Sequence, residues 1–193
     1  MTGSRDLSMI GATRKSFDPS AITIRACGED DMRAVAEIYG HHVLHSTATF
    51  ELHPPSLEEM TRRRRVIVEG GYVYLVAEAD LGLIGYAYAG AYHGRPGYRF
   101  TVENSVYVRE GYRGAGVGMQ LMQALLAECQ KRPYRQMIAV IGDSANRASI
   151  ELHSRLGFRR IGTLQSVGFK FGRWLDSVLM QKDIGDGDGT KPD

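Results

Sequence analysis

The spacing of apolar residues between positions 22 and 181 predicts a series of strands and helices. Ile22–Ala26 alternates apolar and polar residues, as a strand with one buried face does. Glu29–Ser46 carries apolar residues at helical spacing. A second helix is expected to begin at Ser56, because the run Ser-Leu-Glu-Glu matches a capping box. The predicted inward face of that helix consists of Leu57, Met60, Arg64 and Ile67.

Two strand-like runs follow, and more strands then alternate with two further helices. Tyr72–Ala79 and Leu83–Tyr92 are joined by a short connection that contains glycine, which predicts a hairpin. Residues 93–97 are rich in glycine and proline and are expected to hold no regular element. The remaining predicted elements are strand Phe100–Val108, helix Val117–Lys131, strand Gln136–Ile141, helix Asn146–Leu156 and strands Phe158–Thr163 and Lys170–Gln181. The order β-α-α-β-β-β-α-β-α-β-β predicts an α/β (α+β) fold, a mixed sheet with helices on its faces.

The length of 193 residues fits a single domain. Apolar residues make up 43% of the chain and charged residues 24%, the balance of a soluble globular protein. We assign residues 21–183 to this domain. Residues 1–20 lack a core-forming pattern, and residues 184–193 are rich in glycine and aspartate. Both segments are expected to be flexible tails.

The net charge and the lengths of the apolar runs argue against nucleic acids and membranes as partners. The formal net charge is +2, from 24 Lys and Arg against 22 Asp and Glu, which is too even for a typical nucleic-acid binder. No apolar run approaches the ~18 residues of a transmembrane helix, so no membrane is expected as a partner. The N-terminus has no signal-peptide core. Cys27 and Cys129 therefore predict two reduced thiols in a cytoplasmic protein.

Neither the histidines nor the run of four arginines predicts a special binding site. The histidines have no metal-ligand spacing, so no metal is expected. The run Arg62–Arg65 lies in a predicted helix, which cannot direct four consecutive side chains the same way. A solvated face with acidic neighbours is therefore expected there, rather than a basic binding patch.

The segment that says most about chemistry is Arg113–Gly118, between the strand end Val106-Tyr107-Val108 and a helix. Its glycines leave successive backbone N–H groups unobstructed, and the positive end of the following helix completes a cradle for a pyrophosphate. No Gly-Lys-Ser/Thr follows, so it is not a Walker loop, and its spacing does not match GxGxxG. Taken alone, it is equally compatible with a plain strand-to-helix turn.

Other segments make the chain similar to the GNAT superfamily of acyl-CoA N-acyltransferases. Asn146-x-x-Ser149-Ile150-x-Leu152-His153, followed by Leu156-Gly157-Phe158, matches the second signature of that superfamily. Over about residues 22–183, the chain most resembles the phosphinothricin and methionine sulfoximine acetyltransferase family. The segments that carry this closer resemblance are Thr47–Glu51, Ala87–Gly90, Thr101–Val108, Ala139–Gly142 and Gly168–Asp176.

The resemblance implies the GNAT fold, with acetyl-CoA as co-substrate in a cleft where two neighbouring strands splay apart. Backbone groups of Val106, Tyr107 and Val108 would then bind the pantetheine arm. Asn146 would bind the cofactor, cap the following helix, or do both. The pyrophosphate would be held by Arg113, Gly114, Ala115, Gly116, Val117 and Gly118.

The resemblance also implies two catalytic residues. Glu103 would assist deprotonation of the acceptor amine, because only the free base attacks, and His153 would protonate the CoA thiolate. The alternatives are a Glu103 that is solvent-exposed or paired with an arginine, and a structural His153. The acceptor site would be lined by Phe50, Arg95, Tyr98 and Tyr107. Arg95 would supply a cation for an acidic group, or it would be an ordinary exposed loop residue.

The function implied is that of a homodimeric enzyme, an N-acetyltransferase. It would move the acetyl group of acetyl-CoA to the α-amino group of a small glutamate analogue such as phosphinothricin, methionine sulfoximine or methionine sulfone. One alternative is a GNAT enzyme for another small-molecule or protein amine. The other is a non-catalytic acyl-CoA-binding module, against which Glu103 and His153 argue, because a module needs only the phosphate loop.

Overall fold

The computed structural model describes residues 19–80 and 82–192. The predicted N-terminal tail therefore lies outside the described residues except for its last two positions. These begin a 3₁₀ turn, η1, at Pro19–Ala21.

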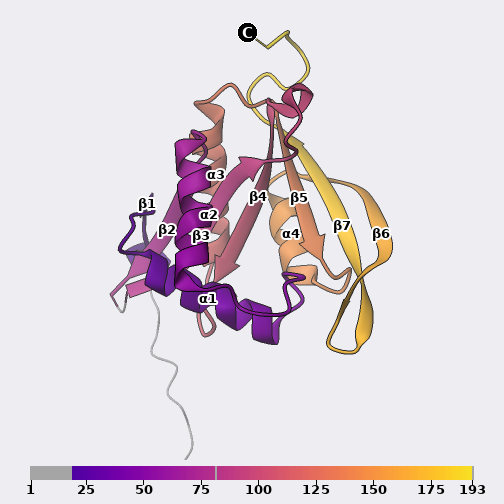
Figure 1. Ribbon diagram of the computed structural model, residues 1–193. Coiled ribbons are helices and arrows are strands. Elements are labelled where there is room, and N and C mark those ends of the chain that lie inside the picture. Colours follow the sequence, from indigo (N-terminus) through magenta and orange to yellow (C-terminus); the bar gives the residue numbers. More distant parts are fainter. Residues whose placement is uncertain (1–18, 81, 193) are drawn as a thin grey trace, which may run out of the picture.

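Within the described residues, one seven-stranded sheet has the order β1-β2-β3-β4-β5-β7-β6 (Figure 1). Neighbouring strands are antiparallel except for the parallel pair β4 and β5. The strands are β1 (Thr23–Ala26), β2 (Tyr74–Ala79), β3 (Gly82–Ala91), β4 (Thr101–Val108), β5 (Gln136–Gly142), β6 (Arg159–Lys170) and β7 (Arg173–Asp183). The helices are α1 (Met32–His45), α2 (Leu57–Glu69), α3 (Val117–Gln130) and α4 (Arg147–Arg155). This order of strands and helices confirms the predicted one.

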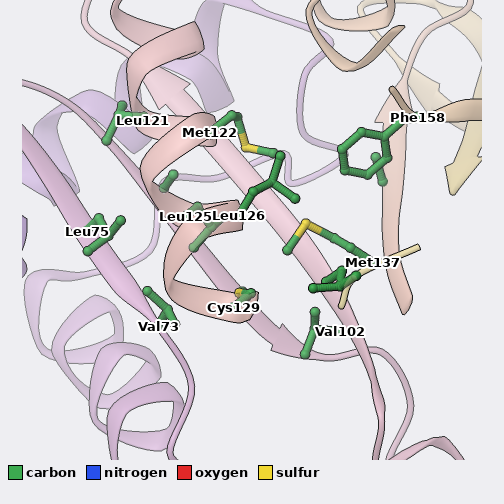
Figure 2. Close-up of a cluster of buried hydrophobic side chains, with 14 of the residues drawn as sticks. Val73, Leu75, Val102, Leu121, Met122, Leu125, Leu126, Cys129, Met137 and Phe158 are labelled. Atoms are coloured by element: carbon green, nitrogen blue, oxygen red, sulfur yellow. The ribbon is translucent and has the colours of Figure 1, made fainter. Parts of the chain in front are cut away.

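The helices cover the sheet on both faces and create two apolar cores. Helices α3 and α4 pack on one face, and α1 and α2 pack on the other (Figure 1). On the α3 face, Leu121, Met122 and Leu125 are fully buried in one cluster with Val102 of β4 and Met137 of β5 (Figure 2). The apolar repeat of α3 thus builds the larger core, as its sequence predicts.

Strand β2 supplies side chains to both cores. Leu75 faces the α3 core, whereas its neighbours Tyr74 and Val76 face α1 and α2. Because successive side chains of a strand point to opposite faces, a strand covered on both sides reads as a continuous apolar run. Cys27 and Cys129 lie one in each core as buried free thiols.

Helix α2 shows how local sequence signals are used. Ser56 Oγ accepts a hydrogen bond from the Glu59 backbone N–H at 3.1 Å, which confirms the predicted cap. Arg62 and Arg63 both pair with Glu59, while Arg64 donates to the Cys27 carbonyl. Arg64 therefore points away from Arg62 and Arg63, which share an acidic partner, so the three side chains make no joint basic patch.

The structure also differs from the sequence predictions in places. Residues 93–97 do not lack regular structure throughout, because Pro96–Tyr98 forms a 3₁₀ turn, η2, in which proline supplies the helical φ at the first position. Leu57 was expected to face inward but is 41% exposed. Ile184 was assigned to the C-terminal tail, yet it is 1% exposed and belongs to the α3 core. Its backbone N–H donates to the Arg135 carbonyl at 2.9 Å.

The last hairpin is longer than predicted. Strand β6 continues past Thr163 to Lys170, with a register shift against β7 between Leu164 and Gly168. The turn follows at Phe171 and Gly172, which both have positive φ, so Lys170 ends β6 and does not begin β7. The shift includes Ser166, also at positive φ, whose N–H donates to Asp176 Oδ1 at 3.0 Å.

Candidate active site

The sheet opens between β4 and β5. Their parallel pairing ends at Asn104 and Ala139, although β4 continues to Val108 and β5 continues to Gly142 (Figure 1). A cleft of about 770 Å³ lies at this opening, lined by the ends of both strands, the end of α1, the beginning of α3 and most of α4. The two strand edges that face the cleft therefore carry backbone groups with no partner strand.

Backbone geometry determines which groups of β4 face the cleft. The Arg109 N–H donates to the Ile84 carbonyl of β3 at 2.8 Å. Because backbone polar groups alternate in direction along a strand, those of Val106 and Val108 point away from β3 and toward the opening. At the end of β5, Gly142 has no side chain, and a Cβ there would collide with the Thr47 carbonyl of the chain that crosses it.

The loop between β4 and α3 forms a concave turn at the mouth of the cleft. Gly114 and Gly116 have φ of 76° and 81°, the left-handed region that glycine adopts at little cost. Gly116 is the N-cap of α3 and provides no side-chain hydrogen bond, so the first N–H groups of that helix lack a side-chain acceptor. Both glycines line the cleft together with Val117 and Gly118. Unbonded N–H groups at a positive helix end suit an anionic phosphate.

Arg113 stands beside this loop and is linked to α1. Its guanidinium donates to His42 Nδ1 at 3.4 Å and lies 3.3 Å from the Glu110 carboxylate. The other ring nitrogen of His42 donates to the Val108 carbonyl at 3.0 Å. Burial holds the pKa of His42 below its ordinary value, so the neutral ring is favoured. His42 thus connects the end of β4 to Arg113 of the glycine loop, a link that the sequence did not indicate.

His153, on α4, lines the cleft but is only 2% exposed. Its Nδ1 lies 2.8 Å from the Ser149 carbonyl, and its Nε2 lies 2.9 Å from Asn104 Oδ1. Burial lowers its pKa, which the Ser149 carbonyl partly offsets. Both ring nitrogens are therefore engaged by protein oxygens. Asn146 caps α4 by accepting from the Ser149 N–H at 3.3 Å and also lines the cleft, so the two roles considered for it are compatible.

Glu103 lies on the opposite face of β4 from His153, because its neighbour Asn104 is the residue that contacts the histidine. Glu103 is half-buried, and burial raises the pKa of its carboxyl. Among the described residues it has no ion-pair partner, so the arginine-paired alternative is not observed. It does not line the cleft itself but lies near Tyr88, whose pKa it helps to raise.

The residues predicted to bind the acceptor are not gathered in the cleft. Arg95 and Tyr98 lie at η2, which precedes β4, whereas the glycine loop follows β4 at its other end. Arg95 has no ion-pair partner in the described part of the chain, and Tyr98 is 41% exposed. Phe50 packs against the backbone of Gly168. Tyr107 directs its ring into an aromatic cluster with Tyr39, Tyr86 and His42, and only its backbone side is near the opening.

A polar cluster that sequence reasoning missed lies on the face of Glu103. Tyr39 donates to Glu51 Oε1 at 2.9 Å, and Arg63 Nη1 approaches the same oxygen at 2.6 Å. Tyr88 lies close enough for Arg63 and Glu51 to affect its pKa. These side chains come from α1, α2, β3 and an intervening loop. The Thr-x-Thr-Phe-Glu segment was the one signal in the sequence that pointed here.

Comparison with known proteins identifies the fold. The family model for the acetyltransferase (GNAT) domain matches residues 24–179. The chain belongs to the GNAT acetyltransferase family. It is 50% identical to phosphinothricin N-acetyltransferase from Alcaligenes faecalis, over 90% of this chain and 88% of that protein. It is 40% identical to L-methionine sulfoximine/L-methionine sulfone acetyltransferase from Pseudomonas aeruginosa, over 84% of this chain and 94% of that protein.

Solved GNAT structures are similar over nearly the whole domain. A phosphinothricin acetyltransferase from Sinorhizobium meliloti, in complex with acetyl-CoA, has a TM-score of 0.87 at 45% identity, covering 90% of this chain and 94% of that one. The predicted family membership and GNAT fold are thus confirmed. Among the described residues of this GNAT domain, no group of three or more His, Cys, Asp or Glu side chains is arranged to hold a metal ion. No described helix is long and apolar enough to cross a membrane.

Proposed function

We propose that this protein transfers the acetyl group of acetyl-CoA to the α-amino group of a small glutamate analogue, such as phosphinothricin, methionine sulfoximine or methionine sulfone. The observation that carries the proposal is the opening between β4 and β5, with the glycine loop at its mouth. The relatives named above, acetyltransferases for such acceptors, support the choice of substrate.

The cleft fits acetyl-CoA in shape and polarity. The edge of β4 offers the backbone groups of Val106 and the N–H of Val108 to the amides of a pantetheine arm. The Val108 carbonyl already accepts from His42, and the backbone groups of Tyr107, which were predicted to take part, point toward β3 instead. The loop Arg113–Gly118, including Ala115, which does not line the cleft, offers N–H groups and a guanidinium to the pyrophosphate. Asn146 lies where it can contact the cofactor while capping α4.

Glu103 is proposed as the general base. Its carboxyl is half-buried and without an ion-pair partner in the described part of the chain, and burial raises its pKa toward the working range. The acceptor would approach from the face that carries Glu103, Tyr88 and the Tyr39–Glu51–Arg63 cluster, with Phe50, Arg95 and Tyr98 at its border. His153 is proposed as the proton donor to the leaving thiolate from the opposite face.

A homodimer is proposed from the apolar surface of the last hairpin. Strand β6 is an edge strand of the sheet, and long unprotected edges with apolar side chains favour association. The exposed apolar residues of this hairpin are Ile161, Leu164, Val167, Phe169, Phe171 and Trp174. Sedimentation velocity tests this proposal: the wild type should sediment as a dimer and Val167→Asp as a monomer. A monomeric wild type would contradict it. The cytoplasm is proposed as the location, supported by two free buried cysteines.

The proposed activity is tested by thiol release from acetyl-CoA across a panel of amino acids and analogues. We expect the highest kcat/KM with phosphinothricin or the methionine sulfoximine and sulfone pair, and low values with lysine or polyamines. A clear preference for another amine would move the enzyme to a different acceptor class. Binding of acetyl-CoA without thiol release from any amine would contradict the enzymatic proposal and favour a binding module.

A further inference from the structure

The ring of His42 joins two parts of the cleft wall, the end of β4 and the glycine loop. His42 lies in the last turn of α1 and is 6% exposed, and both His42 and Arg113 line the cleft. Its Nε2 lies 3.0 Å from the Val108 carbonyl, and its Nδ1 lies 3.4 Å from Arg113 Nη2. The two ring nitrogens therefore face groups of opposite hydrogen-bonding character, because a carbonyl only accepts and a guanidinium only donates.

These contacts select one neutral form of the ring. The proton is on Nε2, which donates it to Val108, and Nδ1 is bare and accepts from Arg113. The hydroxyl of Ser46 agrees with this form: its oxygen lies 3.5 Å from Nδ1 and accepts from the Ala48 N–H at 2.9 Å, so its proton is available to Nδ1. The other tautomer would place N–H against N–H at Arg113 and leave the Val108 carbonyl without this donor.

The charged and titratable groups around the ring come from α1, β4 and the loop after β4. His41, the neighbour of His42 in α1, lies 3.5 Å from the Glu110 carboxylate, and the same carboxylate lies 3.3 Å from Arg113 Nε. From β4, Tyr107 contacts the ring edge-on at 5.2 Å between centroids. Burial lowers the pKa of His42 and the Arg113 cation adds to this, whereas the carbonyl at Nε2 and Glu110 oppose it only in part. The neutral ring is therefore the favoured form.

Arg113 is thus held from two sides. Glu110 contacts its Nε, and His42 accepts from its Nη2. The side chain of Arg113 is 47% exposed, and an exposed arginine loses much conformational freedom when a ligand immobilises it. Contacts that order the guanidinium before the ligand arrives reduce this cost. A neutral imidazole can do so without cancelling the positive charge, as a second carboxylate would.

We propose that His42, fixed as the neutral Nε2–H tautomer, is a positioning residue that orders Arg113 for the pyrophosphate of acetyl-CoA. This rests on the proposed binding of acetyl-CoA in the cleft. Because His42 acts through Arg113, its contribution to affinity requires that guanidinium. It also requires the pyrophosphate, and it does not extend to the part of the cofactor that carries the thioester.

The tautomer is tested by nitrogen NMR on protein labelled with ¹⁵N-histidine, with His42→Gln used to assign the signal. At neutral pH we expect the pattern of a ring protonated on Nε2 and bare on Nδ1. Arg113→Ala should shift the Nδ1 signal and leave Nε2 protonated, because the Val108 carbonyl still accepts. A wild-type ring protonated on Nδ1, or an Nδ1 signal that ignores the loss of Arg113, would overturn the link. This readout needs no acetyl-CoA, so it stands apart from failure of the proposed function.

The positioning role is tested by a double-mutant cycle on the affinity for acetyl-CoA, measured by calorimetric titration. Arg113→Ala should weaken binding about tenfold, and His42→Leu at least about threefold, because the guanidinium stays but loses its order. Adding His42→Leu to Arg113→Ala should cause no further loss. The same loss from His42→Leu in both backgrounds would overturn the role, since it would show that His42 acts without Arg113.

Two further measurements separate this role from a general structural defect. His42→Gln, which keeps a donor and an acceptor, should retain most of the affinity, and His53→Leu, at an exposed histidine that does not line the cleft, should match the wild type. With S-acetylpantetheine, which carries the thioester without the pyrophosphate, thiol release by His42→Leu should equal that of the wild type. An equal loss with both acyl donors would overturn the proposal, whereas a wild type that fails to bind acetyl-CoA would overturn the proposed function itself.

Discussion

The ammonium group of Lys170 donates to the Thr49 carbonyl at 2.8 Å and to the Ser46 carbonyl at 2.9 Å. Lys170 is 3% exposed, and burial lowers its pKa. The bonds tie the end of β6 to the segment that follows α1, which continues to Phe50 and Glu51. The far end of the chain therefore holds in place a segment of the proposed acceptor site.

Lys170→Met is expected to remove this connection and leave two buried carbonyl oxygens without their donor. The free energy of unfolding should fall by about 2–3 kcal/mol, as expected for unsatisfied buried polar groups. The KM of the acceptor should rise more than that of acetyl-CoA, because the displaced segment borders the acceptor side. Urea denaturation and steady-state kinetics measure the two effects. Lys131→Met, at an exposed ion pair, is the control and should change neither.

Glu103→Gln keeps the size of the side chain and removes its basicity. If Glu103 is the base, turnover near pH 7 should fall by ~10²–10⁴, the usual contribution of general-base assistance. The affinity for acetyl-CoA should stay the same, since the phosphate loop is untouched. Raising the pH supplies free amine, so the deficit should shrink in alkali. Wild-type turnover in this variant at pH 7 would exclude the carboxylate as base.

The raised pKa of Glu103 also predicts a pH dependence of two kinds. The base form is required for catalysis, so kcat/KM for the acceptor should fall as the pH drops through a pKa above the ordinary 4.5. For stability the sign is opposite: the folded state holds this proton more tightly than the unfolded state, so ionisation destabilises the fold as pH rises. Glu103→Gln should therefore raise the free energy of unfolding more at pH 7 than at pH 4.5. An equal effect of this substitution at both pH values, measured by urea denaturation, would contradict the burial argument.

Gly116→Val tests the phosphate loop. Gly116 has φ of 81°, which a β-branched residue rarely adopts, so the N-terminus of α3 should distort. Affinity for acetyl-CoA, measured by calorimetric titration, should weaken at least about tenfold, or roughly 1.4 kcal/mol. Gly162→Ala is the comparison, because that glycine has ordinary φ and open space around its α-carbon. Equal affinities in the two variants would remove the loop from the binding site.

The cysteines should be inert toward thiol reagents in the folded protein. Burial raises the pKa of Cys27 to about 11 and that of Cys129 to about 12, so neither forms a thiolate near pH 8. Both should react only after unfolding, which a chromogenic disulfide reagent measures with and without denaturant. Rapid labelling of native protein would show that one of the cores opens.

The sequence predicts this fold well where the signals are local. Helix α3 is recognisable from its apolar spacing, and the cap of α2 lies within four consecutive residues. Strand β6 was predicted too short because its continuation depends on a contact with Asp176, ten residues after Ser166. Such a contact leaves no periodic trace in the sequence.

The residues proposed to bind the cofactor and those proposed to bind the acceptor differ in how far apart they lie along the chain. The glycine loop proposed to hold the cofactor can be recognised in the sequence because it is contiguous. The Tyr39–Glu51–Arg63 cluster cannot, because its residues come from separate segments that meet only in the folded chain. Glu103 and Asn104 are neighbours in one strand, so their side chains, and the groups that they contact, lie on opposite faces of the sheet.

The short pairing between β4 and β5 divides the sheet into two halves, β1–β4 and β5–β7, that are joined at one end only. Four residue pairs connect these strands, whereas seven pairs connect β5 to β7. With fewer paired residues to hold them together, the two halves of the sheet should change their relative angle more readily between β4 and β5 than between β5 and β7.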